Sequence, residues 1–380
     1  MAKEFSPSPP PLTPPLTVEE KRSWLRLLRS RRVGPTTFHR LMAEHGSADA
    51  ALAALPEVAR AAGVESYRPV AMDLVDTEFE AAERCGARAL WYGADDYPDL
   101  LAELPDAPPL LWAIGDAALL KKPLIALVGA RNASSLGTRM ARRLAADLGE
   151  AGHVIVSGLA RGVDTAAHLG AMETGTVAVF AGGVDVIYPA ENAVLGQEIG
   201  ERGLRLSEQP MHFAPKARHF PARNRIVSGL CQAVVVVEAA AKSGSLITAR
   251  TALDQGREVF AIPGHPFDAR ASGANMLIRD GAMLTRSAKD VIEALERPAP
   301  RETAGVHIPE APPERRTLQD MAALHGEILT RLGPSPVAED QLIRDLMRPA
   351  GEVTPILTAL ELDGRIERRP GGLLAVVPAA

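Results

Sequence analysis

The chain has 380 residues, and its 42 lysines and arginines against 47 aspartates and glutamates give a formal net charge of −5 at pH 7. This length predicts about two to three domains with a sizeable core, which argues against a disordered protein. Aromatic residues make up only 4% of the chain. An aromatic-rich single-strand binder and a uniformly basic nucleic-acid-binding domain are therefore disfavoured, and any contact with nucleic acid requires a local basic patch.

The first 17 residues contain six prolines and no continuous apolar run. This composition predicts a disordered tail rather than a signal peptide or a membrane span. The two cysteines, Cys85 and Cys231, match neither a disulfide framework nor the spacing of metal ligands. We therefore expect a protein of the reducing cytoplasm, with no metal and no cofactor.

Residues 18–85 are predicted to form a small helical module. Apolar residues recur at three and four positions up to about residue 62, with breaks at Gly34-Pro35 and at Gly46. Short helices joined by such turns resemble helix-hairpin-helix or SAM-like units. Some of these units contact DNA backbones, and more of them mediate protein contacts, so both roles stay open.

Residues 86–295 are predicted to be a doubly wound α/β domain, with residues 86–122 as a connecting lead-in. Short valine- and isoleucine-rich runs alternate with helical patterns from residue 123 onward, which is typical of a parallel sheet covered on both faces. In such a domain, ligands bind at the carboxyl ends of the strands. The runs lie at residues 124–130, 153–158, 176–183, 204–208, 233–239 and 258–264.

A proline-rich stretch, residues 296–317, is predicted to be a linker before a third module at residues 318–380. This module shows three amphipathic helical segments and then two short strands around residues 370–372, which is the outline of a winged helix. Many winged helices read DNA and many bind only protein. The third helical segment carries carboxylates and no basic residue before Arg365, so reading of a major groove is not favoured.

The loop after the first apolar run contains Arg131, in the sequence Gly-Ala-Arg-Asn. A dinucleotide loop, G-x-G-x-x-G, needs small residues where the backbone approaches the pyrophosphate, so an NAD site is not favoured. An arginine beside a helix N-terminus with free N–H groups is instead a site for isolated phosphates. The alternative is a surface ion pair.

The next two loops combine small residues with arginine. Ser157 and Gly158 end the second run, Arg161 follows in the turn, and Asp164 or Thr165 is placed to cap the next helix. After the third run, Gly182 stands in a double glycine that permits close approach of a ligand or forms a tight turn. His168 is expected to be a packed core histidine rather than a metal ligand, because no second histidine stands at metal spacing.

The densest basic signal lies between residues 216 and 225. Lys216, Arg218, Arg223 and Arg225 surround Phe220, with no acidic residue between the first and the last of them. Several cations near one aromatic ring suit a sugar-phosphate backbone with a base resting on the ring. A solvated basic face is the alternative, and interspersed glutamates would be typical of it.

A further phosphate cradle is predicted at Lys242, Ser243, Gly244 and Ser245, which stand at the start of a helix after the fifth run. The spacing is not that of a Walker A loop, so ATP hydrolysis is not indicated. Glu238 at the end of the same run is placed to brace Arg131 or Arg225. We find no catalytic constellation in the sequence.

Six motifs in this order resemble the bacterial DNA-processing protein DprA (Smf) family: GARNAS, SGLARGVDTAAHLGA, GGVDVIYPAEN, FPARNRIVSGL, EAAAKSGSLITA and IPGHP with SGANMLIRDGA. The resemblance covers the whole central domain, and the flanking modules are similar to accessory domains of that family. It implies a Rossmann-like domain that binds single-stranded DNA, forms a homodimer and helps to load the RecA recombinase on incoming strands during natural transformation. It also implies that no reaction is catalysed.

The resemblance implies that Arg131 and the basic residues around FPARNR hold DNA phosphates, and that Gly158, Gly182 and Gly244 let the strand approach the backbone. Relatives place a lysine a few residues before the Phe-Pro pair, and here Lys216 and Arg218 bracket that position, so either is the expected contact. The residues expected to contact DNA are Arg131, Ser157, Gly158, Arg161, Gly182, Lys216, Arg218, Phe220, Arg223, Asn224, Arg225, Lys242, Ser243, Gly244 and Ser245.

Two alternatives remain at this point. The same Rossmann-like superfamily includes nucleotide-binding enzymes of the phosphoribohydrolase type. Their sequence motif is similar to a glycine-rich loop followed by a catalytic glutamate. Here Thr248 stands where that acid is expected, so the general acid/base is missing. The other alternative is an interaction scaffold whose basic cluster binds an acidic protein.

Overall fold

The computed structural model describes residues 12–61, 66–296, 318–332, 336–362, 365–369 and 373–377. Most of the predicted tail (residues 1–11) and nearly all of the predicted linker (residues 297–317) lie outside these ranges. The chain divides into two compact units, one within residues 1–49 and 70–301 and the other within residues 50–69 and 302–380. We describe each unit by itself.

Helices form the described part of residues 18–85, which confirms the predicted helical module; the apolar spacing indicated those up to about residue 62, and a further helix follows at residues 72–84. Thr17 caps the first of them, because its hydroxyl accepts from the Glu20 backbone N–H while the Glu20 carboxylate accepts from the backbone N–H of Thr17. Gly46 ends the second helix in the left-handed conformation, with φ of 77°, which confirms the predicted break. The helices are α1 (Val18–Arg29), α2 (Pro35–His45), α3 (Ala48–Ala61) and α4 (Met72–Arg84).

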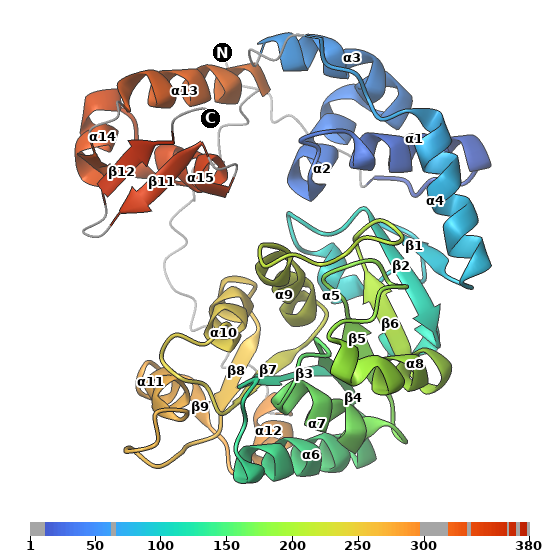
Figure 1. Cartoon of the computed structure of the whole chain (residues 1–380), viewed down its shortest axis with the longest axis vertical. Coiled ribbons are helices and arrows are strands. Elements are labelled where there is room, and N and C mark those ends of the chain that lie inside the picture. Colours follow the sequence, from blue (N-terminus) through green and yellow to red (C-terminus); the bar gives the residue numbers. More distant parts are fainter. Residues whose placement is uncertain are drawn as a thin grey trace, which may run out of the picture. The chain divides into compact units, whose positions relative to one another are not determined.

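A nine-stranded sheet forms the centre of the first unit, in the order β1-β2-β6-β5-β4-β3-β7-β8-β9 (Figure 1). The strands from β6 to β9 in this order are parallel. All six predicted runs form strands of this parallel part. The strands are β1 (Arg88–Trp91), β2 (Leu110–Gly115), β3 (Leu124–Gly129), β4 (Val154–Ser157), β5 (Thr176–Val179), β6 (Leu204–Ser207), β7 (Ala233–Val237), β8 (Glu258–Ala261) and β9 (Met283–Leu284).

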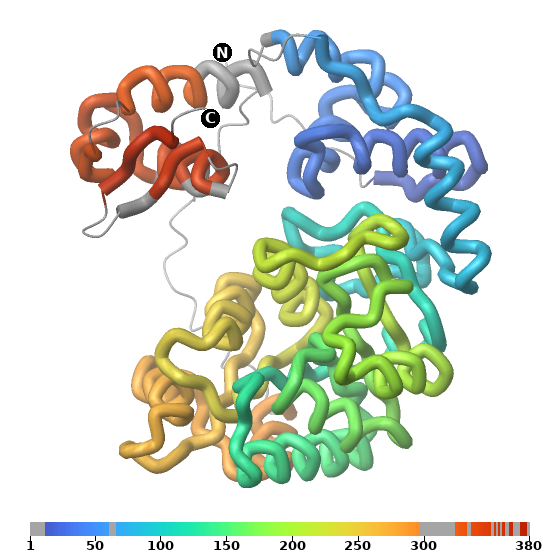
Figure 2. Tube along the Cα trace, viewed as in Figure 1, coloured from blue at the N-terminus to red at the C-terminus, as the bar shows by residue number. Residues whose placement is uncertain are grey.

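Helices cover both faces of the sheet, which confirms the predicted doubly wound α/β fold. On one face lie α6 (Ser135–Glu150), α7 (Val163–Ala171), α8 (Ala193–Arg202) and α12 (Ala288–Leu295). On the other lie α5 (Asp99–Ala102), α9 (His219–Gly229), α10 (Ser245–Asp254) and α11 (Ser272–Arg279). Figure 2 traces this alternation of strand and helix along the chain. None of the helices within the described ranges is long and apolar enough to cross a membrane.

The lead-in was predicted to be a connecting stretch, and this was wrong in part. Residues 86–122 contribute β1, β2 and two short helices, α5 and the 3₁₀-helix η1 (Ala117–Lys121). β2 pairs antiparallel with β6, so that Trp112 faces Ser207, and β1 pairs antiparallel with β2. Prolines and turn residues between the two strands hide their pattern in the sequence. The sheet is therefore mixed at one edge and parallel elsewhere.

The order in which the strands are connected determines where a ligand site is expected in this sheet. From β3 the chain proceeds through β4, β5 and β6 in one direction, and it then returns to form β7 on the other side of β3. β3 and β7 are parallel neighbours, with Gly129 opposite Val237 at their carboxyl ends. The loops that leave these two ends turn to opposite faces of the sheet, and the gap between them is the typical ligand site of an open α/β sheet.

The second unit contains the predicted winged helix. Three helices pack with a three-stranded antiparallel sheet around a core that includes Ile328 of the first of these helices and Ile366 and Leu374 of the strands. The two predicted strands flank residues 370–372, and a short additional strand, β10, joins them. The elements are α13 (Leu318–Arg331), β10 (Val337–Ala338), α14 (Glu339–Leu346), α15 (Ala350–Leu362), β11 (Ile366–Arg369) and β12 (Leu373–Val376).

Candidate functional site

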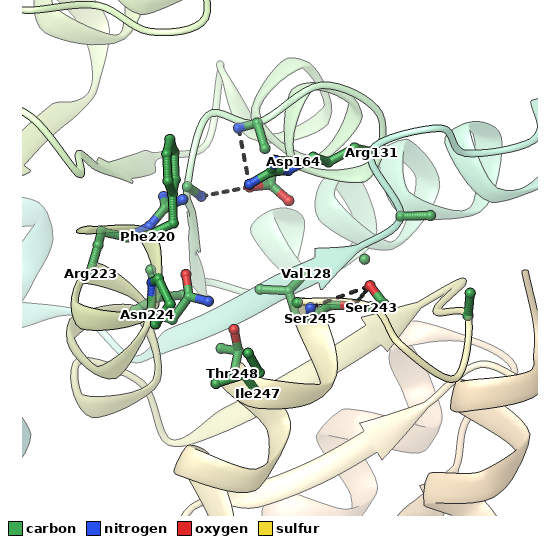
Figure 3. A pocket seen from close by; sticks show the side chains of 18 of the residues that line it. Val128, Arg131, Asp164, Phe220, Arg223, Asn224, Ser243, Ser245, Ile247 and Thr248 are labelled. Carbon is green, nitrogen blue, oxygen red and sulfur yellow. Dashed lines mark hydrogen bonds between the residues drawn. The ribbon is translucent and has the colours of Figure 1, made fainter. Parts of the chain in front are cut away.

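A cavity of about 790 Å³ lies at the carboxyl ends of β3 and β7. Its walls come from the loops that follow β3, β4, β5, β6, β7 and β8 and from the helices α9 and α10. Figure 3 shows Phe220, Arg223 and Asn224 of α9 on one side, Ser245, Ile247 and Thr248 of α10 on another, and Arg131 with Asp164 across from them. We call this cavity the switch-point pocket. Its position is the one that the doubly wound topology predicts.

The charge of the pocket is strongly positive. The described residues that line it include four cations, Arg131, Arg223, Lys242 and Arg270, and one carboxylate, Asp164. Arg131 and Lys242 are exposed, and no ion pair to either is found within the described part of the chain. Arg270 is paired with Asp268. Because the two cations without an ion pair, Arg131 and Lys242, lie on one concave surface, the pocket favours an anion with more than one charged group, such as several phosphates of one chain.

The Phe220 ring lies within cation–π distance of two of these cations. The guanidinium carbon of Arg131 is 5.2 Å from the centre of the Phe220 ring, and that of Arg223 is 6.0 Å from it. The ring of Tyr188 lies 5.8 Å from Phe220, centroid to centroid. Rings and guanidinium planes are surfaces on which a nucleobase stacks. Phosphate-binding and base-stacking groups therefore stand together in one pocket.

Arg223 is the buried cation of the site, with 5% of its surface exposed. Its Nη1 donates to the carbonyl oxygen of Val179 over 2.7 Å, and its Nε has no partner among the described residues. Burial lowers the pKa of Arg223 to about 10, against the attraction of Asp164. The guanidinium therefore stays charged at neutral pH and adds to the positive charge of the pocket.

Gly158 makes room for this guanidinium. A Cβ atom at residue 158 would lie 2.5 Å from Nη2 of Arg223 and closer still to two other guanidinium atoms. Such contacts do not occur in real structures, so only glycine allows Arg223 to lie against the end of β4. The group that lies against Gly158 in this structure is a side chain of the protein, whereas the sequence analysis expected the DNA strand to approach the backbone there.

Asp164 fixes the loop after β4. Its carboxylate accepts from the backbone N–H groups of Gly158 (3.1 Å) and Ala160 (3.2 Å). Burial raises the pKa of Asp164, while Arg223 lowers it. The expectation that Asp164 or Thr165 caps α7 was wrong, because Gly162 is the N-cap residue and no side chain caps it. Asp164 lies one residue inside the helix and reaches back to the preceding loop.

The predicted cradle at residues 242–245 is part of the pocket. Gly244 is the N-cap residue of α10, where no side-chain cap bond forms. The hydroxyls of Ser243 and Ser245 lie 2.6 Å apart, and the Ser243 hydroxyl accepts from the Ser245 backbone N–H over 3.3 Å. The N–H groups of Leu246 and Ile247 donate to the carbonyl oxygens of Ser243 and Gly244, so the first turn of α10 is satisfied within the chain. The two hydroxyls and the exposed Lys242 are therefore the groups that a phosphate would contact here.

The groups at the start of α6 already have hydrogen-bond partners in the protein, although the sequence predicted free N–H groups there. The Ser134 hydroxyl accepts from the Gly137 N–H over 3.0 Å, and the Glu238 carboxylate accepts from both the backbone N–H (2.8 Å) and the hydroxyl of Ser134. The predicted free N–H groups beside Arg131 are therefore occupied by the protein's own groups. The expectation that Glu238 braces Arg131 or Arg225 was also wrong, because its carboxylate binds Ser134, 104 residues away in the sequence.

Six of the residues predicted to contact DNA, Arg225 among them, do not line the switch-point pocket. Ser157 is buried, and its hydroxyl donates to the Leu127 carbonyl oxygen over 2.7 Å. Gly182 is buried against the loop at Phe213 and Pro215. Arg161 is exposed and lies 3.6 Å from Glu191. Lys216 and Arg218 are exposed and flank Ala217, which does line the pocket.

Arg225 belongs to an ion-pair network beside the pocket. Its Nη2 pairs with the Glu208 carboxylate, its Nη1 donates to the Asp106 carbonyl oxygen over 2.8 Å, and its Nε lies 3.5 Å from the Asp106 carboxylate. Only 14% of the Arg225 side chain and 13% of the Glu208 side chain are exposed. The structure thus places Arg225 in a supporting position rather than at the surface of the pocket.

The nine other predicted residues line the pocket, and the sequence prediction missed several of their neighbours. Asn132, Ile247 and Thr248 stand next to predicted residues in the sequence, so a wider window would have included them. Tyr188 and Arg270 come from separate loops. Arg270 follows β8, and the rule that ligands bind at carboxyl ends of strands would have pointed to it. The residues brought together are Arg131, Gly158, Phe220, Arg223, Asn224, Lys242, Ser243, Gly244 and Ser245.

The burial of His168 predicts an effect of pH on stability. This side chain is fully buried, with Nδ1 2.7 Å from the Thr176 hydroxyl, which confirms a core histidine. Burial, and then the Arg223 charge, lower the pKa of His168 from 6.5 to about 3. The unfolded chain therefore binds a proton below pH 6.5 that the folded chain does not bind. We expect His168 to reduce the free energy of unfolding by about 1.4 kcal/mol per pH unit as the pH falls below that value.

Urea unfolding of the wild type and of His168→Gln between pH 7.5 and 5, at about half-unit intervals, measures this effect. The pH slope of the free energy of unfolding should be smaller in the variant by about one proton. Equal slopes in the two proteins would show that His168 titrates in the folded state as it does in the unfolded state.

Comparisons with known proteins agree with this architecture. The family model of DNA recombination-mediator protein A matches residues 88–296. Models of the DprA-like N-terminal HHH domain and of the DprA winged helix domain match residues 18–81 and 309–372. The chain belongs to the DNA recombination-mediator protein A family. The predicted family is thereby confirmed.

Curated relatives match over most of their length. The DNA processing protein DprA of Streptococcus pneumoniae is 47% identical over 204 residues, which are 53% of this chain and 72% of the relative. Protein Smf of Escherichia coli is 38% identical over 286 residues, which are 73% of this chain and 74% of the relative.

Two solved structures of the family are similar to this one. DNA processing protein A from Streptococcus pneumoniae has a TM-score of 0.56 and 42% identity, over 59% of this chain and 78% of that chain. DNA processing protein A from Helicobacter pylori, described for its single-stranded DNA binding mode, has a TM-score of 0.51 and 33% identity, over 55% of this chain and 95% of that chain.

Proposed function

We propose that this protein binds single-stranded DNA without regard to sequence and acts as a non-enzymatic recombination mediator in the cytoplasm. The observation that carries the proposal is the composition of the switch-point pocket, where the guanidinium carbons of Arg131 and Arg223 lie 5.2 and 6.0 Å from the centre of the Phe220 ring. Cations hold phosphates of any sequence, and an aromatic ring stacks on any base. The single-stranded DNA binding described for the Helicobacter pylori relative supports the same assignment.

The form of the pocket favours a single strand over a duplex. Phe220 is only partly exposed and lies inside a cavity, not on a flat surface. A base in a duplex is stacked on both faces and must be unstacked before it meets such a ring, which costs a few kcal/mol. An unpaired strand does not carry this cost, so we expect it to bind more tightly than a duplex of the same length.

A nucleotide-processing enzyme is the alternative, and the geometry gives it little support. The helix start at which a dinucleotide phosphate binds is that of α6, after β3. Here Glu238 and Ser134 occupy that helix start, and the carboxylate repels a phosphate. The carboxylate that lines the pocket, Asp164, is engaged by two backbone N–H groups, and Thr248 stands where a catalytic acid is expected.

We also propose that the protein acts together with the RecA recombinase and that it forms a homodimer. The family's description as a recombination mediator supports delivery of the bound strand to RecA. At one edge of the sheet, β9 exposes Met283 and Leu284 (38% and 46% exposed), and an exposed apolar edge strand is a surface for pairing with a second copy. Light scattering of the purified chain tests the dimer. RecA filament assembly on strands covered by single-strand-binding protein tests the loading.

The pocket itself is tested with Arg131→Ala. The variant removes a cation that lines the pocket and contacts Phe220, so we expect the affinity for labelled oligo-dT to fall about tenfold. The slope of log affinity against log salt should decrease by about 0.7, the value for one phosphate contact on a single strand. Fluorescence anisotropy at several salt concentrations, with oligo-dT and a matched duplex, measures both quantities.

Arg143→Ala is the matched control, because Arg143 is an exposed arginine of α6 that pairs with Asp147 and does not line the pocket. It should leave affinity and salt slope close to the wild-type values. Equal binding by the wild type and Arg131→Ala would refute the site. Equal affinity of the wild type for single strand and duplex would refute the proposed single-strand preference.

A further inference from the structure

Phe267 is the most exposed large hydrophobic residue in the described part of the chain, with 95% of its surface accessible. It lies in the segment between β8 and α11, residues 262–271, which we call the rim loop. A side chain of this size is normally buried or partly covered. A fully exposed aromatic residue beside a charged pocket indicates a contact surface for a ligand.

The rim loop forms part of the wall of the switch-point pocket. Arg270 of this loop lines the pocket, and Phe267 is three residues away, so the two Cα atoms are at most about 11 Å apart. The turn between them is tight, because the Asp268 carboxylate accepts from both the backbone N–H and the guanidinium of Arg270. A strand that contacts Arg270 is therefore within reach of the Phe267 ring.

The loop is also held in a defined position. Asn275 forms two hydrogen bonds with the backbone of Gly264, of 3.1 and 2.9 Å. At the other end, the Ser272 hydroxyl accepts from the Ala241 N–H, and the Gly273 N–H donates to the Ala239 carbonyl oxygen. The last two bonds tie the start of α11, where the rim loop ends, to the β7–α10 connection, which carries Lys242 and Ser243 of the pocket. The ring is thus presented by a fixed backbone, which limits the entropy lost on binding.

We propose that Phe267 is a second base-stacking residue, at the far side of the pocket from Phe220. Figure 3 shows Phe220 and Ser243 on opposite sides of the pocket. Ser272, which directly follows the rim loop, accepts from the N–H of Ala241, two residues before Ser243. A single strand then runs from Phe220 and Tyr188, across the cations, past Lys242 and Arg270, to Phe267. This inference rests on the proposed function, and it extends the binding path beyond the residues of the six sequence motifs that the pocket brings together.

The proposal predicts an effect that depends on the length of the strand. Phe267→Ala should weaken binding of oligo-dT of roughly 16 nucleotides by about five- to tenfold and leave binding of roughly 4 nucleotides unchanged. The short strand fills the Phe220 end, and only the long strand reaches the rim loop. Leu253→Ala is the matched control, since Leu253 is 56% exposed at the other end of α10, and it should change neither affinity.

A fluorescent variant tests the stacking directly. The three tryptophans of the chain, Trp24, Trp91 and Trp112, are 4%, 7% and 1% exposed, so Phe267→Trp introduces an exposed indole into a buried background. Long oligo-dT should quench this indole and keep near wild-type affinity, whereas short oligo-dT should not quench it. The measurement uses the full chain and anisotropy of the same samples.

Any result that differs from these expectations contradicts the inference. Equal affinity of wild type and Phe267→Ala for the long strand, or no quenching of the indole at saturation, would assign the exposed ring to another partner such as a protein. An equal loss with both lengths would mean that the substitution disturbs the pocket. Failure of the wild type itself to bind oligo-dT would refute the proposed function, which separates that failure from a failure of Phe267 alone.

Discussion

Arg225→Ala is expected to lower the free energy of unfolding of the first unit by about 3 to 5 kcal/mol. The Glu208 carboxylate is 13% exposed, and Arg225 is the cation paired with it. Burial already raises the pKa of Glu208, while the charges of Arg225 and Arg29 lower it. Removal of Arg225 leaves this carboxylate buried without its main partner, and it also leaves the Asp106 carbonyl oxygen without its donor.

Urea unfolding at neutral pH measures the loss, with Arg202→Ala as the control. Arg202 pairs with Glu173 and Glu198 at the surface and is 41% exposed, so its replacement should cost less than about 1 kcal/mol. The double variant Arg225→Ala with Glu208→Gln should recover part of the stability, because the unpaired charge is then absent. A loss no larger than that of the control would contradict the supporting role of Arg225.

Gly158→Ala is expected to reduce the affinity for oligo-dT more than tenfold, which exceeds the effect of Arg131→Ala. The added methyl group would occupy the space of the Arg223 guanidinium, which must then leave its bond to Val179. Two consequences follow for the pocket. Phe220 loses one of its two cation contacts, and the donor at Arg223 Nε is displaced.

Anisotropy titration measures this effect, with Gly34→Ala as the control because nothing lies within 4 Å of a Cβ at that position. Since Gly158 acts through Arg223, the same methyl group should have little further effect in an Arg223→Ala background. Independent, additive losses in the double variant would show that Gly158 matters for another reason, such as direct contact of the strand with the backbone.

The fold was predictable because its signals are local. Uninterrupted valine and isoleucine runs indicated the six parallel strands from β3 to β8, and their alternation with helical patterns indicated a doubly wound sheet. β1 and β2 were not predicted, since prolines and turn residues surround them and they pair antiparallel at one edge. The winged helix followed from three amphipathic segments and a hairpin around residues 370–372.

The site was predictable in part, and α9 shows why. Phe220 and Arg223 are three residues apart and share one face of this helix, whereas Arg223 and Arg225 are two apart and point in different directions. The sequence alone did not distinguish which of the arginines and the lysine around Phe220 would face a ligand. Once the segment forms a helix, Arg223 faces the pocket and Arg225 faces Asp106 and Glu208.

By itself, the sequence determined the α/β architecture, the family and the loops at which cations gather. Only the tertiary structure decided which polar groups remain free for a ligand. Arg225 is paired with Glu208, and the start of α6 is closed by Glu238, whereas Arg131 and Lys242 line the pocket without an ion pair within the described residues. The physical reason is that local propensity acts over a few neighbouring residues. Ion pairing depends on distance in space, and the partners here come from strands and loops far apart in the chain.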